Sequence, residues 1–212
     1  MISAGIFGGS GYMGGEVLRV LLDHPYVDIA WATSRQPSAI ESYHPNLYGT
    51  GIELIHPDDA TSCDVVFVAL PTDASIDVTQ RYWDDDTKII DLGSAFRLRD
   101  RTIWERVYGM THPAWSLAEQ AVYGLNELHL KEISQAQLIA NPGCFSSAAI
   151  LGIAPLVANR LVDIEKLSVD GLSGTAGAGA ELSRSIHHPE IGNNLVPYNP
   201  LGIVISTRLN RN

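Results

Sequence analysis

The chain has 212 residues, of which 45% are hydrophobic, a formal net charge of −10 and two cysteines. This length accommodates one large or two small domains with ample core. The acidic balance and the lack of a basic run argue against a nucleic-acid partner. No charged segment followed by an apolar stretch opens the chain, so no secretory signal is expected. The longest apolar run, residues 148–158, is too short for a membrane span, and we expect reduced thiols and a cytoplasmic location.

A strand, a glycine turn and a helix follow one another at the start of the chain. Residues 2–7 are predicted as a strand, and residues 16–22 carry apolar residues at helical spacing. The turn between them reads Gly-Gly-Ser-Gly-Tyr-Met-Gly, a variant of the dinucleotide fingerprint, whose glycines let the backbone approach a pyrophosphate. A tight turn without a ligand is the alternative. The expected cofactor-binding residues of the turn are Gly8, Ser10, Gly11, Tyr12, Met13 and Gly14.

The residues after the second predicted strand, 28–32, indicate which dinucleotide is bound. An NAD site usually has an acidic residue here to hold the ribose hydroxyl, whereas this chain has Ser34 and Arg35. A hydroxyl and a guanidinium suit a 2′-phosphate, so the predicted cofactor is NADP. An exposed Arg35 in an ordinary loop is the alternative.

Further along, residues 65–70 form a continuous apolar run that is typical of a strand buried in a parallel sheet. Pro71 follows this strand and is expected to contact the cofactor. We expect Thr72 or Asp73 to cap a helix that runs to about residue 83.

Strands and helices alternate through the first two thirds of the chain, with further strands predicted at residues 88–92 and 138–140. This alternation predicts an α/β fold, a doubly wound parallel sheet of the Rossmann type. Ligands of such sheets bind beyond the carboxyl ends of the strands. We therefore expect the glycine turn, Pro71, Arg97 and Cys144 to converge at one edge of the sheet.

Cys144 stands where the last of these strands turns into a predicted helix, residues 146–158. The unpaired N–H groups and the dipole of a helix start stabilise a thiolate, so Cys144 is the predicted catalytic nucleophile. A buried structural cysteine is the alternative. That structural role is the prediction for Cys63, which lies at the start of an apolar strand with no turn or helix start beside it.

The character of the chain changes after about residue 160. Residues 166–170 are predicted as a strand, and the glycine-rich segment 171–180 either wraps closely around a ligand or acts as a flexible linker. We therefore divide the chain into a dinucleotide-binding domain, residues 1–145, and an incomplete α+β substrate domain, residues 146–212. The nearest candidate for a metal site is a pair of histidines at residues 187–188. We predict a polar loop there and expect no metal.

Seven motifs occur in order along the chain. They are residues 8–14, 33–35, 91–98, 123–127, 141–144, 173–179 and 193–199. Together they resemble the N-acetyl-gamma-glutamyl-phosphate reductases, relatives of aspartate-semialdehyde dehydrogenase, over residues 2 to about 202. The resemblance implies NADPH-dependent reduction of an acyl phosphate of arginine biosynthesis to a semialdehyde. It also implies a small-molecule substrate and a homo-oligomer at full length.

The same resemblance implies roles for individual residues. The Cys144 thiolate would attack the acyl phosphate carbonyl and form a thioester, which is then reduced. Backbone N–H groups at the helix start would hold the oxyanion. Arg97 is the candidate clamp for a carboxylate or phosphate, with a structural ion pair as its alternative. Asn141, Ser173 and Gly174 complete the expected substrate-binding set.

The chain departs from the family after Gly202, where a Gly-His-Arg-His type motif with an acid/base histidine is expected and residues 203–212 follow instead. The codons GGC ATC GTC ATT, for Gly-Ile-Val-Ile, read His-Arg-His in a shifted frame. Loss of one base in the Gly202 codon is therefore one hypothesis and a genuinely shortened protein the other; the gene sequence distinguishes them. The short chain is expected to bind NADP weakly and to have little reductase activity, since losing acid–base help costs ~10²–10⁴-fold in rate.

Two other functions stay open beside the reductase. One is a related reductase that acts on an aminoadipyl phosphate of lysine biosynthesis, distinguished by the residues that contact the acyl group. The other is a catalytically inactive NADP-binding module, in which Cys144 does not react with acyl phosphates.

Overall fold

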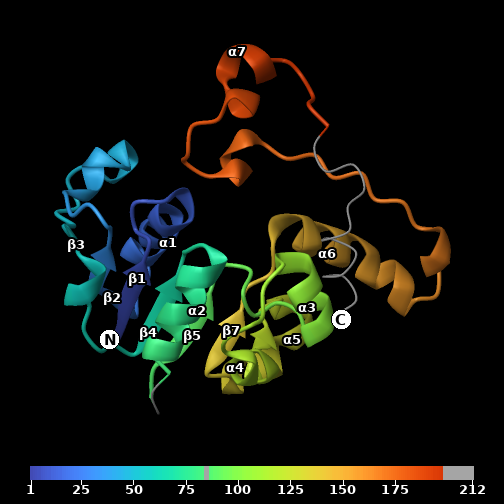
Figure 1. Cartoon of the computed structure of the whole chain (residues 1–212), viewed down its shortest axis with the longest axis horizontal. Helices are drawn as coiled ribbons and strands as arrows, with labels where there is room; N and C mark the ends of the chain where they lie inside the picture. The colour runs from blue at the N-terminus through green and yellow to red at the C-terminus, as the bar shows by residue number, and fades with distance from the viewer. Residues whose placement is uncertain (84–85, 198–212) are drawn as a thin grey trace. The chain divides into compact units, whose positions relative to one another are not determined.

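The computed structural model of the chain describes residues 1–83 and 86–197. It consists of two compact units, Met1–Pro142 and Gly143–Asn212 (Figure 1). The predicted frameshift at Gly202 and the end of the last motif, residues 198–199, lie outside the described residues.

The first unit is built on a parallel sheet of seven strands in the order β3-β2-β1-β4-β5-β7-β6. The strands are β1 (Ile2–Phe7), β2 (Val27–Thr33), β3 (Leu54–Ile55), β4 (Val65–Val68), β5 (Lys88–Asp91), β6 (Val122–Tyr123) and β7 (Leu138–Ala140). The predicted doubly wound parallel sheet is thus confirmed. Strands β3 and β6 were not predicted from the sequence, because two residues are too few to show an alternating pattern.

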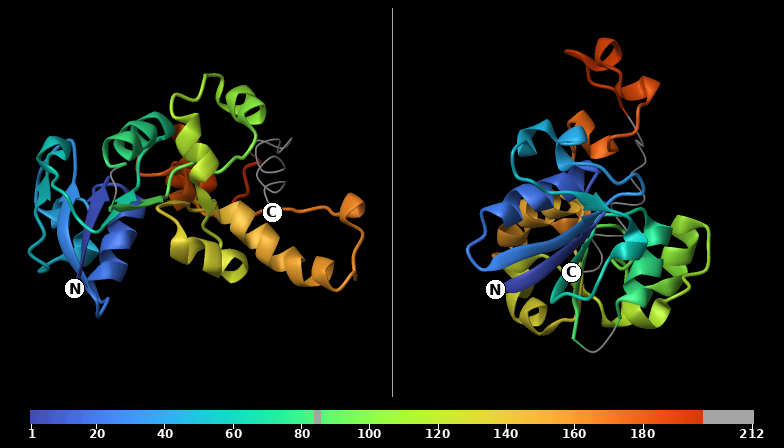
Figure 2. Two further views of the ribbon diagram at one scale, coloured as in Figure 1. Left: turned by 90° about the horizontal axis from the view of Figure 1, so that it is seen from below. Right: turned by 90° about the vertical axis from the view of Figure 1, so that its left-hand side faces the viewer.

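Helices cover both faces of this sheet (Figure 2). The α-helices of the first unit are α1 (Tyr12–Leu22), α2 (Thr72–Arg81), α3 (Arg101–Tyr108), α4 (Trp115–Gln120) and α5 (Asn126–Gln135). The same unit has short 3₁₀ helices η1 (Ile40–Ser42), η2 (Pro45–Leu47) and η3 (Pro57–Asp59). Helices α1 and α2 lie on opposite faces, as expected where right-handed crossovers leave the centre of a sheet in opposite directions.

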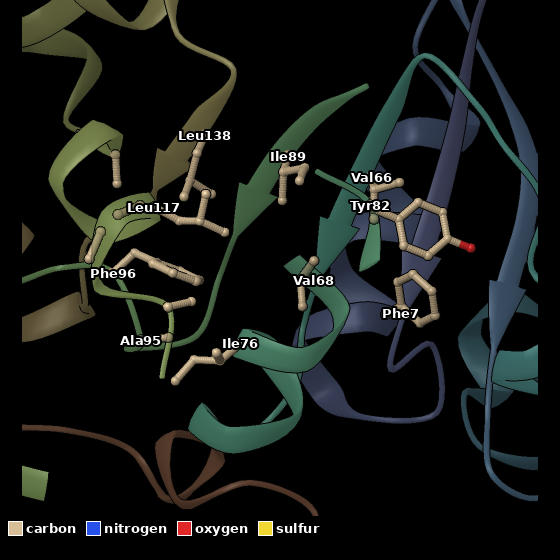
Figure 3. Close-up of a cluster of buried hydrophobic side chains, with 14 of the residues drawn as sticks. Phe7, Val66, Val68, Ile76, Tyr82, Ile89, Ala95, Phe96, Leu117 and Leu138 are labelled. Carbon is tan, nitrogen blue, oxygen red and sulfur yellow. The ribbon is translucent and has the colours of Figure 1, made fainter. Parts of the chain in front are cut away.

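Two buried clusters account for the stability of the first unit. Alternate residues of β1 point to opposite faces: Ile6 packs with Leu18 of α1 in one cluster, while Phe7 belongs to the other. In the cluster that contains Phe7, its ring meets Trp31 edge-on at 4.9 Å between ring centroids. The Phe7 ring also lies 5.3 Å from that of Tyr82, and Figure 3 shows these two rings. Each fully buried side chain of this size contributes about 1.5–3 kcal/mol.

The start of α2 differs from the prediction. Pro71 is the N-cap, with φ −57° and ψ 159°, and no side chain caps the helix. Thr72 and Asp73 are already helical residues and so cannot occupy the cap position. The Thr72 hydroxyl instead pairs with the Ser94 hydroxyl at 3.0 Å, and the helix ends at Arg81 rather than near residue 83.

The second unit begins with α6 (Cys144–Ala158), which starts two residues before the predicted helix. The strand predicted at residues 166–170 is wrong: η4 (Ile164–Lys166) is followed by a stretch without regular structure up to η5 (Thr175–Ala178). A strand needs a neighbour to accept its backbone hydrogen bonds, and the described part of this unit contains no other strand.

The rest of the second unit is made of short elements, η6 (Arg184–Ile186) and α7 (His188–Ile191). Only Ser146, Ala149 and Ile150 are buried among its described residues, 143–197. Among the described residues of the whole chain, every helix is too short or too polar to cross a lipid bilayer.

Candidate functional site

The glycine turn links β1 to α1 in a conformation that requires glycine at two positions. Gly8 has φ +83°, in the left-handed region, and a Cβ there would lie 2.4 Å from the Ala69 carbonyl oxygen. A Cβ at Gly14 would lie 2.1 Å from the Gly8 carbonyl oxygen. The first turn of α1 therefore packs directly on the backbone of the glycine turn. Gly11 is less restricted, since the nearest atom to its Cβ would be 3.5 Å away.

This packing leaves backbone donors unpaired at the helix start. Gly9 donates its N–H to the Thr33 carbonyl at 2.8 Å, whereas the amides of Ser10, Tyr12 and Met13 make no hydrogen bond within residues 1–83 and 86–197. The N-cap, Gly11, has no side chain to satisfy them. Several unpaired amides at the positive end of a helix dipole fit the pyrophosphate of a dinucleotide.

The loop after β4 lies against the glycine turn. Ala69 donates its N–H to the Phe7 carbonyl at 3.0 Å, and Pro71 is exposed as the N-cap of α2. Because β2 and β4 flank β1 on opposite sides, the chain reverses its direction of winding here. Dinucleotides bind at such switch points in open α/β sheets.

Ser34 and Arg35 follow the end of β2, on the other side of the turn. Ser34 is buried: its N–H donates to the Ile55 carbonyl at 2.9 Å and its hydroxyl oxygen accepts from the Gln36 N–H at 3.1 Å. The Arg35 side chain is exposed and makes no ion pair with the described residues. Its charge is therefore available to an anion that arrives from solvent.

Arg97 and Asn141 join the loops after β5 and β7. The Arg97 side chain is buried, and its Nε donates to the Asn141 carbonyl at 2.7 Å while Nη2 donates to the Leu92 carbonyl at 2.9 Å. Asn141 in turn donates its N–H to the Asp91 carbonyl at 2.8 Å. The guanidinium thus stabilises the relative position of two loops at the carboxyl edge.

Asp91, the last residue of β5, is a buried carboxylate that sequence reasoning did not single out. Its Oδ1 accepts from the Ser75 hydroxyl at 2.6 Å and from the Gly93 N–H at 2.9 Å. Burial raises the pKa of Asp91 above its ordinary value, and these two hydrogen bonds and the positive charge of Arg97 oppose that shift. The available signal in the sequence was an acidic residue directly after the apolar pair Ile89 and Ile90.

The structure therefore brings four predicted features of the first unit to the carboxyl edge of one sheet. The glycine turn contacts the loop that leads to Pro71, and this loop meets the loop after β5, where a Cβ on Gly93 would lie 3.0 Å from the Leu70 carbonyl oxygen. Arg97 then connects that loop to Asn141.

Cys144 is the first residue of α6 in the second unit, and it is exposed. The N-cap before it, Gly143, has extended backbone angles and no side chain. The thiol is thus placed at the N-terminus of a fifteen-residue helix. By contrast, Cys63 is buried and its thiol donates to the Val65 carbonyl at 3.3 Å, as predicted for a structural cysteine.

Ser173 and Gly174 also belong to the second unit, and both are exposed. The Ser173 hydroxyl donates to the Gly174 carbonyl at 3.1 Å, and Gly174 is the N-cap of η5. The histidine pair is divided: His187 precedes α7 and His188 begins it. The described residues contain no group of three or more His, Cys, Asp or Glu arranged to hold a metal ion.

Comparison with known proteins identifies two matching domains. Residues 3–136 match the family model of the semialdehyde dehydrogenase NAD-binding domain, and residues 144–202 match that of the semialdehyde dehydrogenase dimerisation domain. In fold, the chain is similar to aspartate semialdehyde dehydrogenase II of Vibrio cholerae, with a TM-score of 0.54 and 16% identity over 74% of this chain and 47% of that one.

Two relatives of similar identity to this chain are named for different substrates. An N-acetyl-gamma-glutamyl-phosphate reductase of Methanopyrus kandleri is 44% identical over 94% of this chain and 60% of the relative. A [LysW]-L-2-aminoadipate/[LysW]-L-glutamate phosphate reductase of Sulfurisphaera tokodaii is 40% identical over 93% of this chain and 58% of the relative. The chain thus spans about 60% of the length of the curated relatives it matches.

Proposed function

This chain belongs to the semialdehyde dehydrogenase family, and we propose that the whole protein uses NADPH to reduce N-acetyl-glutamyl 5-phosphate to N-acetyl-glutamate 5-semialdehyde and phosphate. The observation that carries the proposal is the exposed Cys144 at the first residue of α6. The names of relatives at 40–44% identity support the choice of substrate.

In the proposed reaction, the Cys144 sulfur attacks the acyl carbonyl carbon. A C–S bond forms, the C–O bond to the phosphate breaks, and phosphate leaves with the bonding electron pair. Backbone N–H groups at the start of α6 would stabilise the oxyanion that forms during the attack. When the thioester has been reduced, the C–S bond breaks, which releases the aldehyde and returns the electron pair to sulfur.

The glycine turn is the proposed cofactor site. The unpaired amides of Ser10, Tyr12 and Met13 would hold the pyrophosphate, and the bound nicotinamide would supply the hydride that reduces the thioester carbon. The exposed guanidinium of Arg35 supports NADP over NAD, because no acidic side chain stands at its position after β2. Gly8, Gly11, Gly14, Ser34 and Pro71 complete the proposed cofactor-binding set.

The proposed substrate-binding residues are Arg97, Asn141, Ser173 and Gly174. The positive charge of Arg97 supports this role for an anionic substrate. Its hydrogen bonds to two carbonyls show that it also has a structural role, and so a loss of activity on its substitution would not by itself prove substrate binding.

The nucleophile is tested by acylation without reduction. We expect the protein, mixed with N-acetyl-glutamyl phosphate and no NADPH, to gain the mass of the acyl group on the peptide that contains Cys144. Cys144→Ser should give no thioester, and Cys63→Ser, the matched control, should be acylated like the wild type. Dinucleotide binding without acylation of Cys144 would contradict the proposal and favour an inactive NADP-binding module.

The choice of cofactor is tested with Arg35→Ala. We expect the affinity for NADPH to fall by about ten- to a hundredfold, since one charge-assisted contact contributes about 1.5–3 kcal/mol, while the affinity for NADH stays the same. Equal effects on both nucleotides in an equilibrium binding titration would argue against a contact with the 2′-phosphate.

A second candidate substrate is a [LysW]-L-2-aminoadipate or [LysW]-L-glutamate phosphate. The names of relatives at 38–41% identity favour it. Acylation assays with the N-acetyl substrate and with the [LysW] substrate distinguish the two candidates. Both substrates would acylate the same cysteine, and they differ only in the N-substituent that the protein must recognise.

We further propose that the whole protein forms a homo-oligomer. The match of residues 144–202 to a dimerisation domain supports this, as do the exposed apolar side chains of the second unit, among them Leu172 and Leu195. Light scattering coupled to gel filtration should give at least twice the mass of one chain.

A further inference from the structure

His44 is a buried histidine that lies beneath the glycine turn, 35 residues away from it in sequence. Its backbone is held on both sides: its N–H donates to the Ile40 carbonyl at 2.8 Å, and its carbonyl accepts from the Leu47 N–H at 2.9 Å. The side chain is thereby aimed from the start of η2 toward the first turn of α1.

The ring makes one polar contact with the glycine turn. Nε2 of His44 lies 2.9 Å from the Gly9 carbonyl oxygen. Because a carbonyl oxygen only accepts, Nε2 must carry a proton and donate it. Gly9 is therefore fixed at both of its polar groups, since its N–H already donates to the Thr33 carbonyl.

Fixing this carbonyl also fixes the next amide. The Gly9 carbonyl and the Ser10 N–H belong to one planar trans peptide group, so they point in opposite directions. With the carbonyl directed at His44, the Ser10 N–H points away from the protein interior. That amide is one of those that stay unpaired at the start of α1.

The surroundings of the His44 ring and of Gly9 are closely packed. A Cβ on Gly15 of α1 would lie 2.4 Å from Cε1 of the His44 ring, so the ring is pressed against the helix backbone. On the other side, a Cβ on Gly9 would lie 2.9 Å from Cδ2 of Leu54. Neither the ring nor Gly9 therefore has space for an additional methyl group beside it.

We propose that His44 is a positioning residue for the dinucleotide, which holds the Gly9–Ser10 peptide so that the Ser10 amide faces the pyrophosphate. This inference rests on the cofactor site of the proposed function but not on its acyl chemistry. Without the His44 donor, the Gly9 carbonyl is free to rotate toward the phosphate, where it would replace a donor with a repelling acceptor.

The test compares ligands with and without a pyrophosphate. NADP⁺ and NAD⁺ both contain one, and adenosine 2′-monophosphate does not. By isothermal titration, we expect His44→Leu to bind both dinucleotides about tenfold more weakly than the wild type, the size expected for one misplaced hydrogen bond to a charged group. Its affinity for adenosine 2′-monophosphate should be unchanged. His44→Gln, whose side-chain amide also donates, should recover most of the dinucleotide affinity.

Two further variants keep the test decisive if His44→Leu does not fold. Gly15→Ala places a methyl group against the ring and should reproduce the selective loss of dinucleotide affinity. His112→Gln changes another buried histidine, whose Nε2 is bonded to the Ala95 carbonyl, and should change no ligand affinity. Equal losses for all three ligands, wild-type affinity in Gly15→Ala, or no dinucleotide binding by the wild type would overturn the inference. Failure of the acyl chemistry appears separately, as missing acylation of Cys144.

Discussion

The two units of the chain bury their apolar side chains to very different extents. In the first unit, 18 buried residues around β4, β5 and α2 form one cluster and eight around β1 and α1 form a second. In the described part of the second unit only three residues are buried, and Leu182 is 97% exposed. The first unit therefore contains the packing that stabilises its own fold, whereas large apolar side chains of the second unit are exposed.

This difference separates two kinds of proposed site residue. The glycine turn, Asp91 and Arg97 are held by contacts inside a packed unit, so changes near them act through packing and hydrogen bonds. Cys144, Ser173 and Gly174 are exposed residues of a unit with little buried surface of its own. Substitutions there should change chemistry or binding with little effect on the unfolding of the first unit.

The largest contrast should come from removal of a core side chain. Phe96 is fully buried in the larger cluster (Figure 3), so Phe96→Ala should lower the free energy of unfolding by about 3–5 kcal/mol. Leu182→Ala, the matched change on the second unit, should stay within about 0.5 kcal/mol. All four tryptophans lie in the first unit, so urea unfolding followed by their fluorescence reports on that unit. Equal effects of the two variants would refute the contrast.

Removal of the buried carboxylate should have the next largest effect. Asp91→Ala leaves the Ser75 hydroxyl and the Gly93 N–H without an acceptor, and we expect a loss of roughly 3 kcal/mol. Asp91→Asn keeps an acceptor oxygen without the buried charge, so its loss should be much smaller. The same unfolding assay distinguishes the two, and an equal loss would show that charge, rather than hydrogen bonding, is what matters at this position.

The charge of Asp91 also predicts a difference in pH dependence. Burial raises its pKa in the folded state, so the folded protein binds this proton more tightly than the unfolded chain, whose Asp pKa is about 3.9. Stability from this group is therefore fully present below about pH 3.9 and is lost as the pH rises through the higher folded pKa. Asp91→Asn should lack this loss. Between pH 4 and pH 7, its free energy of unfolding should therefore decline less with rising pH than that of the wild type, as urea unfolding curves at each pH would measure.

A glycine in each unit provides a smaller contrast. A methyl group at Gly14 would lie 2.1 Å from the Gly8 carbonyl oxygen, whereas nothing lies within 4 Å of one at Gly174. Gly14→Ala should cost about 1–3 kcal/mol of stability and weaken NADP⁺ binding, and Gly174→Ala should change neither. Equilibrium titration and urea unfolding measure both quantities; wild-type binding by Gly14→Ala would show that the turn adapts.

The smallest effect concerns His112, buried against Trp104 at 4.4 Å between ring centroids. Its Nδ1 accepts from the Ala114 N–H, so Nε2 carries the proton and donates to the Ala95 carbonyl. Burial lowers the pKa of His112, so its contribution to stability is present above the unfolded pKa of about 6.5 and is lost as the pH falls below it. His112→Gln should lose less stability between pH 7.5 and pH 5.5 than the wild type; an identical slope would contradict this.

Much of the first unit was predictable because its signals are local. The strands at residues 28–32, 65–70 and 88–92 are apolar runs, and the glycine turn stands between a strand and a helix, so each needs only neighbouring residues to be recognised. The strand predicted at residues 166–170 failed although its residues alternate, because alternation does not supply the neighbouring strand that a sheet requires. Thr72 and Asp73 failed as caps because the chain enters the helix one residue earlier, at Pro71.

The sequence by itself determined the alternation of strands and helices, the glycine turn between β1 and α1 and the position of Cys144 at a helix start, since all of these follow from patterns a few residues long. Only the tertiary structure decided which distant groups meet: His44 with the Gly9 carbonyl, Arg97 with the Asn141 carbonyl, and Asp91 with the Ser75 hydroxyl. These contacts join residues 35, 44 and 16 positions apart. They exist because the parallel sheet brings the carboxyl ends of separate strands to one edge, where buried polar groups must find partners.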